Sequence, residues 1–178
     1  MISVDELIKD ISMKQKKGIP FIVASVVIWI LILIVILLDL PLEKEGMLVF
    51  CCSCPLMPIA YVCGKIIKVD IFDKSNQLGK LGFLFTCNQF LYLLIVMWVY
   101  RAVPEKMVMV YAMVFGAHLL PYSWLYKSLS YRVFAIIIPI VSLILGCMFS
   151  SVIIATTMIA LEIIFCVCLI SEVNIMKK

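Results

Sequence analysis

The sequence has few charged residues, and almost none of them interrupt its long apolar runs. Charged residues make up 15% of the chain and hydrophobic residues 65%, with a mean hydropathy of +1.19. A soluble domain carries about a quarter charged residues, so this composition excludes an ordinary soluble domain. The net charge of +4 is small, and no basic stripe typical of nucleic-acid binding is present. We therefore expect an all-α integral membrane protein whose first partner is the lipid bilayer.

The chain also lacks the motifs of common enzymes. It contains no G-x-S-x-G, H-E-x-x-H, P-loop or G-x-G-x-x-G pattern, and its single histidine, His118, limits acid–base schemes. The eight cysteines lie inside apolar runs, without the spacing of a secreted disulfide framework. We expect reduced thiols and no cofactor, and an enzymatic activity is disfavoured.

Six apolar runs are long enough to cross a bilayer as helices, which takes about 20 residues at a rise of about 1.5 Å per residue. The 39 residues from Val133 to Ser171 contain Glu162 as their only charged residue, and they fit two helices better than one. The chain is thus predicted to be a single membrane domain over residues 1–178, a bundle of six transmembrane helices. The predicted spans are residues 19–40, 46–67, 81–100, 107–126, 133–148 and 150–171.

A short amphipathic helix is predicted before the first span. Ser3 to Glu6 has the S-x-x-E form of a capping box, which begins a helix. Apolar residues follow at helical spacing, with charged residues on the opposite face. We expect this helix to lie on the membrane surface, and the alternative is a solvated helical tail without lipid contact. The apolar positions are Val4, Leu7, Ile8 and Ile11, and the charged ones are Lys9, Asp10 and Lys14.

Lysine and arginine residues gather on one side of the predicted bundle. With six spans, both chain ends lie on the same side as the second and fourth connections. Because this side is the more basic one, the positive-inside rule makes both termini cytoplasmic. Its twelve basic residues are Lys9, Lys14, Lys16, Lys17, Lys65, Lys68, Lys74, Lys80, Lys127, Arg132, Lys177 and Lys178, and the three on the other side are Lys44, Arg101 and Lys106.

Glu162 is the most unusual residue, because a carboxyl group near the middle of a transmembrane helix is costly. It shares a helical face with Ser151, Ala155 and Cys166, a small and polar stripe that should face protein. Glu162 and His118 lie at similar depths, roughly 16 to 18 Å from the outer ends of their spans. We expect Glu162 to be protonated, hydrogen-bonded, paired with His118 or open to a water-filled cavity. The candidate binding residues of such a cavity are Glu162, His118, Asn88, Gln89, Tyr92, Tyr111 and Tyr122.

Prolines are expected to break or kink helices, and Pro58, Pro121 and Pro139 lie at depths similar to or slightly deeper than those of Glu162 and His118. Each proline removes a backbone N–H and leaves a carbonyl group without its donor. A bilayer tolerates this only where the freed group is buried in protein or faces water. The predicted breaks are at Pro55, Pro58, Pro121 and Pro139.

Sulfur-containing residues form a second candidate site in the outer half of the bundle. Thiolate and thioether ligands suit Cu(I), so a soft-metal path is one hypothesis for these residues. The alternative is that they are ordinary packing residues, because no structural-zinc spacing accompanies them. The residues of the hypothetical path are Cys51, Cys54, Met107 and Met109.

The segment ISMKQKKGIPF from Ile11 to Phe21, followed by ASVVIW from Ala24 to Trp29, resembles the start of an uncharacterised family of small bacterial multi-span membrane proteins. The resemblance implies a bacterial plasma-membrane protein of no known activity. In size and number of spans the chain is also similar to the vitamin-binding S-components of energy-coupling-factor importers. Its first span, however, has a lone Ala24 in place of their spaced alanines.

The sequence thus favours a membrane protein that binds or translocates a small solute or ion through a polar cavity around Glu162. The alternative is a non-transporting structural or partner-binding membrane protein, in which the polar cluster serves helix packing. The substrate, the direction and energy source of transport, and the oligomeric state stay open.

Overall fold

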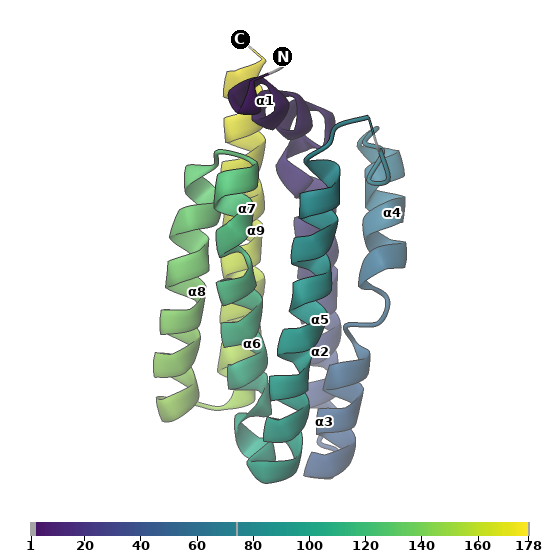
Figure 1. Cartoon of the computed structure of the whole chain (residues 1–178). Helices are drawn as coiled ribbons and strands as arrows, with labels where there is room; N and C mark the ends of the chain where they lie inside the picture. Colours follow the sequence, from purple (N-terminus) through teal and green to yellow (C-terminus); the bar gives the residue numbers. More distant parts are fainter. Residues whose placement is uncertain (1–2, 74, 178) are drawn as a thin grey trace.

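The computed structural model describes residues 3–73 and 75–177, and within these ranges the chain is helical and has no strand. The long helices run side by side, and both ends of the chain lie at the same end of the bundle (Figure 1). Lys74 and Lys178 of the predicted basic side lie outside the described residues. The elements are α1 (Val4–Lys14), η1 (Lys16–Gly18), α2 (Ile19–Leu37), α3 (Leu42–Cys51), α4 (Leu56–Ile66), α5 (Gly79–Ala102), η2 (Pro104–Lys106), α6 (Met107–His118), α7 (Leu120–Leu125), α8 (Leu129–Met148) and α9 (Ser151–Met176).

By length and composition, five stretches of described helix could cross a membrane, and six could if α3 and α4 form one bent span. The prediction of an all-helical chain with several membrane-compatible helices is therefore confirmed for the described residues. The five stretches are Lys16–Leu37, Gly79–Ala102, Pro104–Leu125, Leu129–Met148 and Ser151–Met176.

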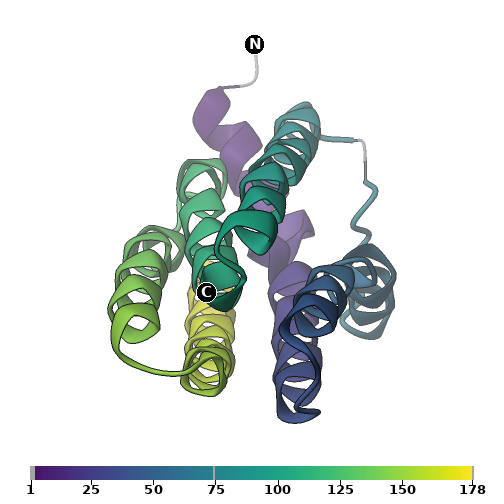
Figure 2. The same cartoon turned by 90° about the horizontal axis from the view of Figure 1, so that it is seen from below.

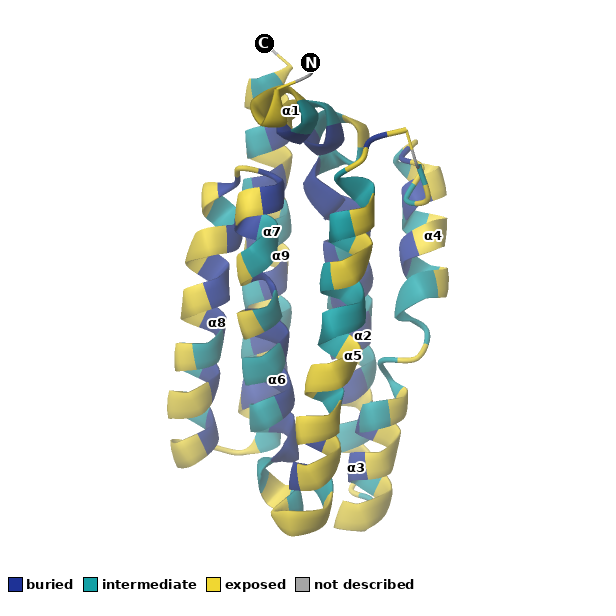
Figure 3. Cartoon of the chain, in the orientation of Figure 1, coloured by how far each residue is buried: buried dark blue, intermediate teal, exposed yellow. Residues whose placement is uncertain are grey.

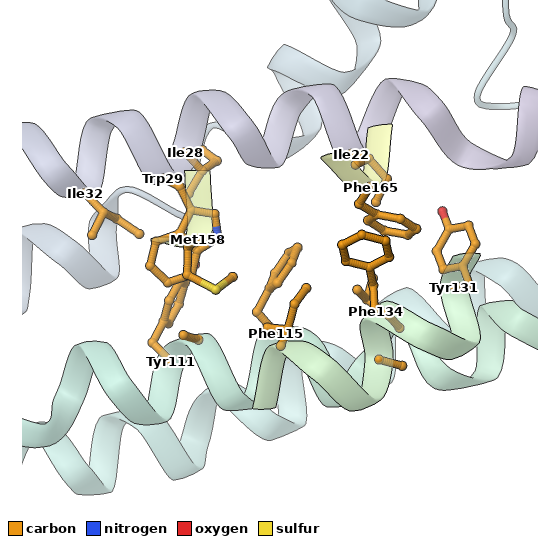
Figure 4. Packing of buried hydrophobic residues seen from close by; sticks show 14 of the residues in the cluster. Ile22, Ile28, Trp29, Ile32, Tyr111, Phe115, Tyr131, Phe134, Met158 and Phe165 are labelled. Atoms are coloured by element: carbon orange, nitrogen blue, oxygen red, sulfur yellow. The ribbon is translucent and has the colours of Figure 1, made fainter. Parts of the chain in front are cut away.

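Two helix pairs, α2 with α9 and α6 with α8, make the most extensive contacts. α4 packs against α2, and α5 packs against α6 and α7. Seen from below in Figure 2, α8 lies at the opposite edge of the bundle from α3 and α4. In the core, Trp29 of α2 meets Tyr111 of α6 edge to face, with ring centroids 5.6 Å apart (Figure 4). Phe134 of α8 stacks on Phe165 of α9 at 4.8 Å.

Large apolar side chains cover the outside of the bundle as well as its core. Buried residues face the middle of the bundle and exposed ones face outward (Figure 3). α5 is the extreme case, because only Val96 and Val99 of its 24 residues are buried. An outer surface this apolar is compatible with a multi-pass membrane protein.

The second predicted span is broken in the middle, as its prolines indicated. α3 ends at Cys51 and α4 begins at Leu56, with a bend of 40° between them. Pro55 is the N-cap of α4 and lies at the break. Pro58 lies inside the first turn of α4, where a backbone N–H has no partner within the helix, so it causes no second break.

Pro121 and Pro139 behave differently from each other. Leu119 separates α6 from α7, and Pro121 lies in the first turn of α7, so a break occurs at the predicted place. α8, in contrast, continues through Pro139, and the predicted break there is wrong. Only the Ala135 carbonyl group loses its usual donor, and the packing of α8 on α6 keeps the rest of the helix in place.

The amino-terminal helix begins where the sequence predicts, whereas the last helix extends beyond its predicted span. α1 has the expected capping box, with Glu6 N–H donating to Ser3 Oγ and Ser3 N–H donating to Glu6 Oε2. Ile8 and Ile11 of α1 are buried against the end of the bundle. At the other end, α9 continues to Met176 instead of ending at residue 171, which adds Glu172 to the helix.

Candidate functional site

The packing of α2 against α9 places Ser25 beside Glu162. Glu162 is fully buried, with 0% of its surface exposed, and Ser25 is also buried. The Ser25 hydroxyl group lies within hydrogen-bonding distance of Glu162 Oε2. Glu162 Oε1 has no hydrogen-bond partner among the described residues. Figure 4 shows Ile22 beside Phe165, the pair one turn away from Ser25 and Glu162 on the same two helices.

The hydrogen bonds around Ser25 favour a protonated Glu162. Ser25 has one hydroxyl hydrogen but two neighbouring acceptors, the Ile22 carbonyl oxygen at 2.8 Å and Glu162 Oε2. If Oε2 carries a proton, the carboxyl group donates to Ser25 Oγ while the Ser25 hydroxyl donates to Ile22. This arrangement gives a partner to the Ile22 carbonyl group, the Ser25 hydroxyl group and Glu162 Oε2, and it buries no net charge. Glu162 Oε1 still has no partner. The pair can therefore hold a proton between α2 and α9.

His118 does not form an ion pair with Glu162 among the described residues. Its Nδ1 is hydrogen-bonded to the Phe115 carbonyl group on its own helix. The ring packs edge to face against Phe115 and Tyr122, with centroids 5.1 and 6.1 Å apart. His118 is the last residue of α6 before the break at Leu119, so its side chain satisfies local groups at that break.

Two of the three tyrosines of the predicted site, Tyr111 and Tyr122, also have other partners. Tyr111 is buried against Trp29. The Tyr122 hydroxyl group lies 2.9 Å from Thr86 Oγ1 on α5. Both residues therefore contribute to packing among α2, α5, α6 and α7.

The three candidates on α5 are not brought to Glu162 by the main helix contacts. Asn88 and Gln89 are half-buried and Tyr92 is 36% exposed. None of the three makes a side-chain hydrogen bond within the part of the chain that the structure describes. α5 packs against α6 and α7, whereas Glu162 lies between α9 and α2.

Ser25 is the partner that sequence reasoning missed. A signal for it exists, because Ser25 is the only hydroxyl residue in the apolar run from Ile19 to Leu38. Hydroxyl groups are frequent interhelical hydrogen-bond donors inside membranes.

A second buried polar cluster lies at the end of the bundle that carries both termini. Lys17 Nζ is 2.6 Å from Glu172 Oε2, and the Lys17 side chain is only 5% exposed. Ser128 Oγ donates to Glu172 Oε2 at 2.7 Å, and Ser130 donates to Oε1 from its backbone N–H and its hydroxyl group. Tyr131 donates to the Lys17 carbonyl oxygen at 2.9 Å. We call Lys17, Glu172, Ser128 and Ser130 the ion-pair cluster.

Sequence reasoning missed the ion-pair cluster because Glu172 lies just beyond the predicted end of the last span. The last span is predicted to end at Ser171, one residue before Glu172, and Lys17 belongs to the basic residues that precede the first span. In the structure, η1 turns Lys17 into the bundle, and Lys16, Lys17 and Gly18 all have positive φ angles, of 44°, 50° and 72°.

The sulfur residues of the hypothetical soft-metal path lie in different surroundings and do not form one site. Cys51 and Cys54 are exposed at the break between α3 and α4. Met107 is buried beside Gly46, and Met109 lies beside Gly146. Across residues 3–73 and 75–177 no three His, Cys, Asp or Glu side chains form a metal-binding group. The four residues are used in packing or face outward.

Comparisons with known proteins identify the family. No curated protein and no solved structure matches the chain. Residues 4–172 match the family of unknown function DUF7010, a match that includes both Glu162 and the ion-pair cluster. The chain therefore belongs to the DUF7010 family of unknown function.

Proposed function

We propose that this chain is a multi-pass membrane protein that binds a proton at Glu162 and uses it in the movement of a small solute or ion. The structure then corresponds to a closed state, in which Glu162 is shielded on all sides. The bacterial plasma membrane is the proposed location, because the opening segment resembles that of small bacterial membrane proteins. Both termini are proposed to be cytoplasmic, since the basic residues concentrate at the end that carries them.

The observation that carries the proposal is the unpartnered carboxyl oxygen of Glu162. A structural hydrogen bond alone would be served by a serine or an asparagine at lower cost than a buried carboxyl group. An ionisable residue inside a membrane bundle is therefore evidence for a role in proton or ion movement. Oε1 is the free position that a solute, a cation or water would contact when the helices separate.

A packing role for the same pair is the alternative. The Ser25–Glu162 hydrogen bond joins two helices that are in extensive contact. Glu162 is 0% exposed, so no open path to it supports transport in this state. The two functions differ in whether the carboxyl group exchanges its proton.

We expect the Glu162→Gln variant to keep its fold but to lose a titratable buried proton. The amide group can donate to Ser25 as the protonated carboxyl group does, so the free energy of unfolding should change by less than about 1.5 kcal/mol. Infrared spectroscopy of the protein in lipid vesicles should show a protonated-carboxyl band that responds to pH in the wild type and is missing in the variant. Glu105→Gln, at an exposed position, is the matched control and should keep the band.

Transport is tested in the same vesicles with a trapped pH-sensitive dye and an imposed membrane potential. Wild-type protein should acidify the vesicle interior faster than vesicles without protein, and Glu162→Gln should not. If the buried carboxyl band never responds to pH and Glu162→Gln acidifies the vesicles as fast as the wild type, the pair has a packing role and the proposal is wrong.

A further inference from the structure

A hollow lies between α1 and the end of the bundle that carries both termini. Its volume is about 450 Å³, within the usual range for small-ligand sites. Lys9 and Asp5 line it from α1, Lys17 from η1, and Tyr126 and Lys127 from the turn after α7. Figure 1 shows α1 across this end of the bundle, beside the last turns of α9. The hollow is separate from the Ser25–Glu162 pair.

The lining of the hollow is positively charged. Lys9, Lys17 and Lys127 line it, against a single acidic residue, Asp5. Because Lys17 is paired with Glu172, the excess positive charge comes from Lys9 and Lys127. Among the described residues Lys9 lies in no ion pair. The Lys127–Asp5 pair, at 3.2 Å, has both side chains at least 75% exposed, so it is weak and can open.

The other nearby carboxylates are already occupied. Glu172 accepts hydrogen bonds from Lys17, Ser128 and Ser130. Asp10 accepts from the Asn76 amide and pairs with Lys14, which together hold the pKa of Asp10 below its ordinary value. Neither group is free to neutralise Lys9 or Lys127. An anion that enters the hollow would therefore meet uncompensated positive charge.

The donors favour a phosphate group over a carboxylate. Lysines act as mobile point charges suited to the several oxygens of a phosphate, whereas planar carboxylates are better matched by arginine, which this hollow lacks. The Ser12 hydroxyl group lies at the wall and now donates to the Tyr126 carbonyl oxygen at 3.2 Å. Its single hydrogen is used in that bond, so the anion would be held by the lysines.

We propose that this hollow binds a phosphate-bearing anion, supplied by the headgroup of an acidic phospholipid. α1 has the composition of an interfacial helix: its exposed face carries Val4 next to charged residues, and Ile8 contributes an apolar wall to the hollow. A headgroup in the hollow would neutralise Lys9 and Lys127 while its acyl chains stay in the bilayer. Free phosphate has the same chemistry and is the other source that the experiment separates.

The test measures lipid retention by native mass spectrometry of the full chain, released from nanodiscs that contain phosphatidylglycerol and phosphatidylcholine. The wild type should keep one phosphatidylglycerol molecule in preference to phosphatidylcholine. Lys9→Gln and Lys127→Gln should each weaken retention about fivefold, the factor for one lysine near an anionic surface. Asp5→Asn should strengthen retention by a similar factor, because it removes the competing carboxylate.

Lys44→Gln is the matched control, since it removes the same charge at the opposite end of the bundle and should leave retention unchanged. In a second arm, inorganic phosphate is added to delipidated protein and the unfolding temperature is measured. Stabilisation by phosphate that depends on Lys9, without selective lipid retention, would identify a soluble phosphate compound as the ligand and overturn the lipid source. If Lys9→Gln behaves like Lys44→Gln in both arms, the hollow is not an anion site.

Discussion

The Glu172→Ala variant should lose about 3–5 kcal/mol of unfolding free energy, because it leaves a buried lysine without its counter-charge. Lys17 has only 5% of its side chain exposed, so water cannot replace the carboxylate. The Ser128 and Ser130 hydroxyl groups lose their acceptor at the same time. Lys17 also has a positive φ of 50°, a strained conformation that the ion pair helps to hold. Unfolding of the purified protein in mixed micelles, followed by circular dichroism, measures the loss.

Two further variants separate the ion pair from the rest of the cluster. The double variant Lys17→Met/Glu172→Met removes both charges and should recover most of the lost stability, as replaced buried pairs do elsewhere. Asp5→Ala breaks the exposed pair with Lys127 and should cost less than about 1 kcal/mol. Equal losses for Glu172→Ala and Asp5→Ala would contradict a buried, structurally important ion pair.

Gly116→Ala should destabilise the bundle by about 1–3 kcal/mol, because it forces a methyl group into the contact between α6 and α8. A Cβ atom at Gly116 would lie 2.6 Å from Pro139 Cδ and 2.7 Å from Ile138 Cβ. The proline ring and the Ile138 Cβ cannot rotate away, so the two helices must move apart. This contact belongs to one of the two most extensive helix pairs, and the same unfolding measurement detects its loss.

Gly79→Ala is the control for this substitution. At Gly79 a Cβ atom would approach nothing closer than the Asp73 carbonyl oxygen at 3.4 Å, an ordinary contact. Alanine there should be neutral or slightly stabilising, since it favours the helix. If Gly116→Ala is as stable as Gly79→Ala, then α6 and α8 are not in the close contact described.

Local sequence patterns predicted the helices well and their interruptions only in part. The capping box at Ser3 and the break at Pro55 both depend on groups within a few residues, and both occur where expected. Pro139 shows the limit of this reasoning. The effect of a proline inside a helix depends on whether neighbouring helices hold the flanking turns, and the sequence does not show which helix packs against α8.

The candidate site was also predicted only in part from the sequence. The expectation that Glu162 faces protein agrees with its complete burial. Its hydrogen-bond partner, however, is Ser25 rather than His118. A similar depth along the bundle does not by itself bring two side chains together. The rotation of each helix about its axis and the order of the helices around the bundle also decide which side chains meet.

The sequence by itself determined the helical class, the apolar character of the helices and the basic end that carries both termini. These properties follow from composition and from backbone hydrogen bonds within each helix, which need no information about neighbours. Only the tertiary structure decided that α2 lies against α9, that Ser25 meets Glu162, and that Lys17 turns inward to Glu172. The reason is physical: apolar helices of similar length can pack in many orders, and close contacts such as that at Gly116 select one of them.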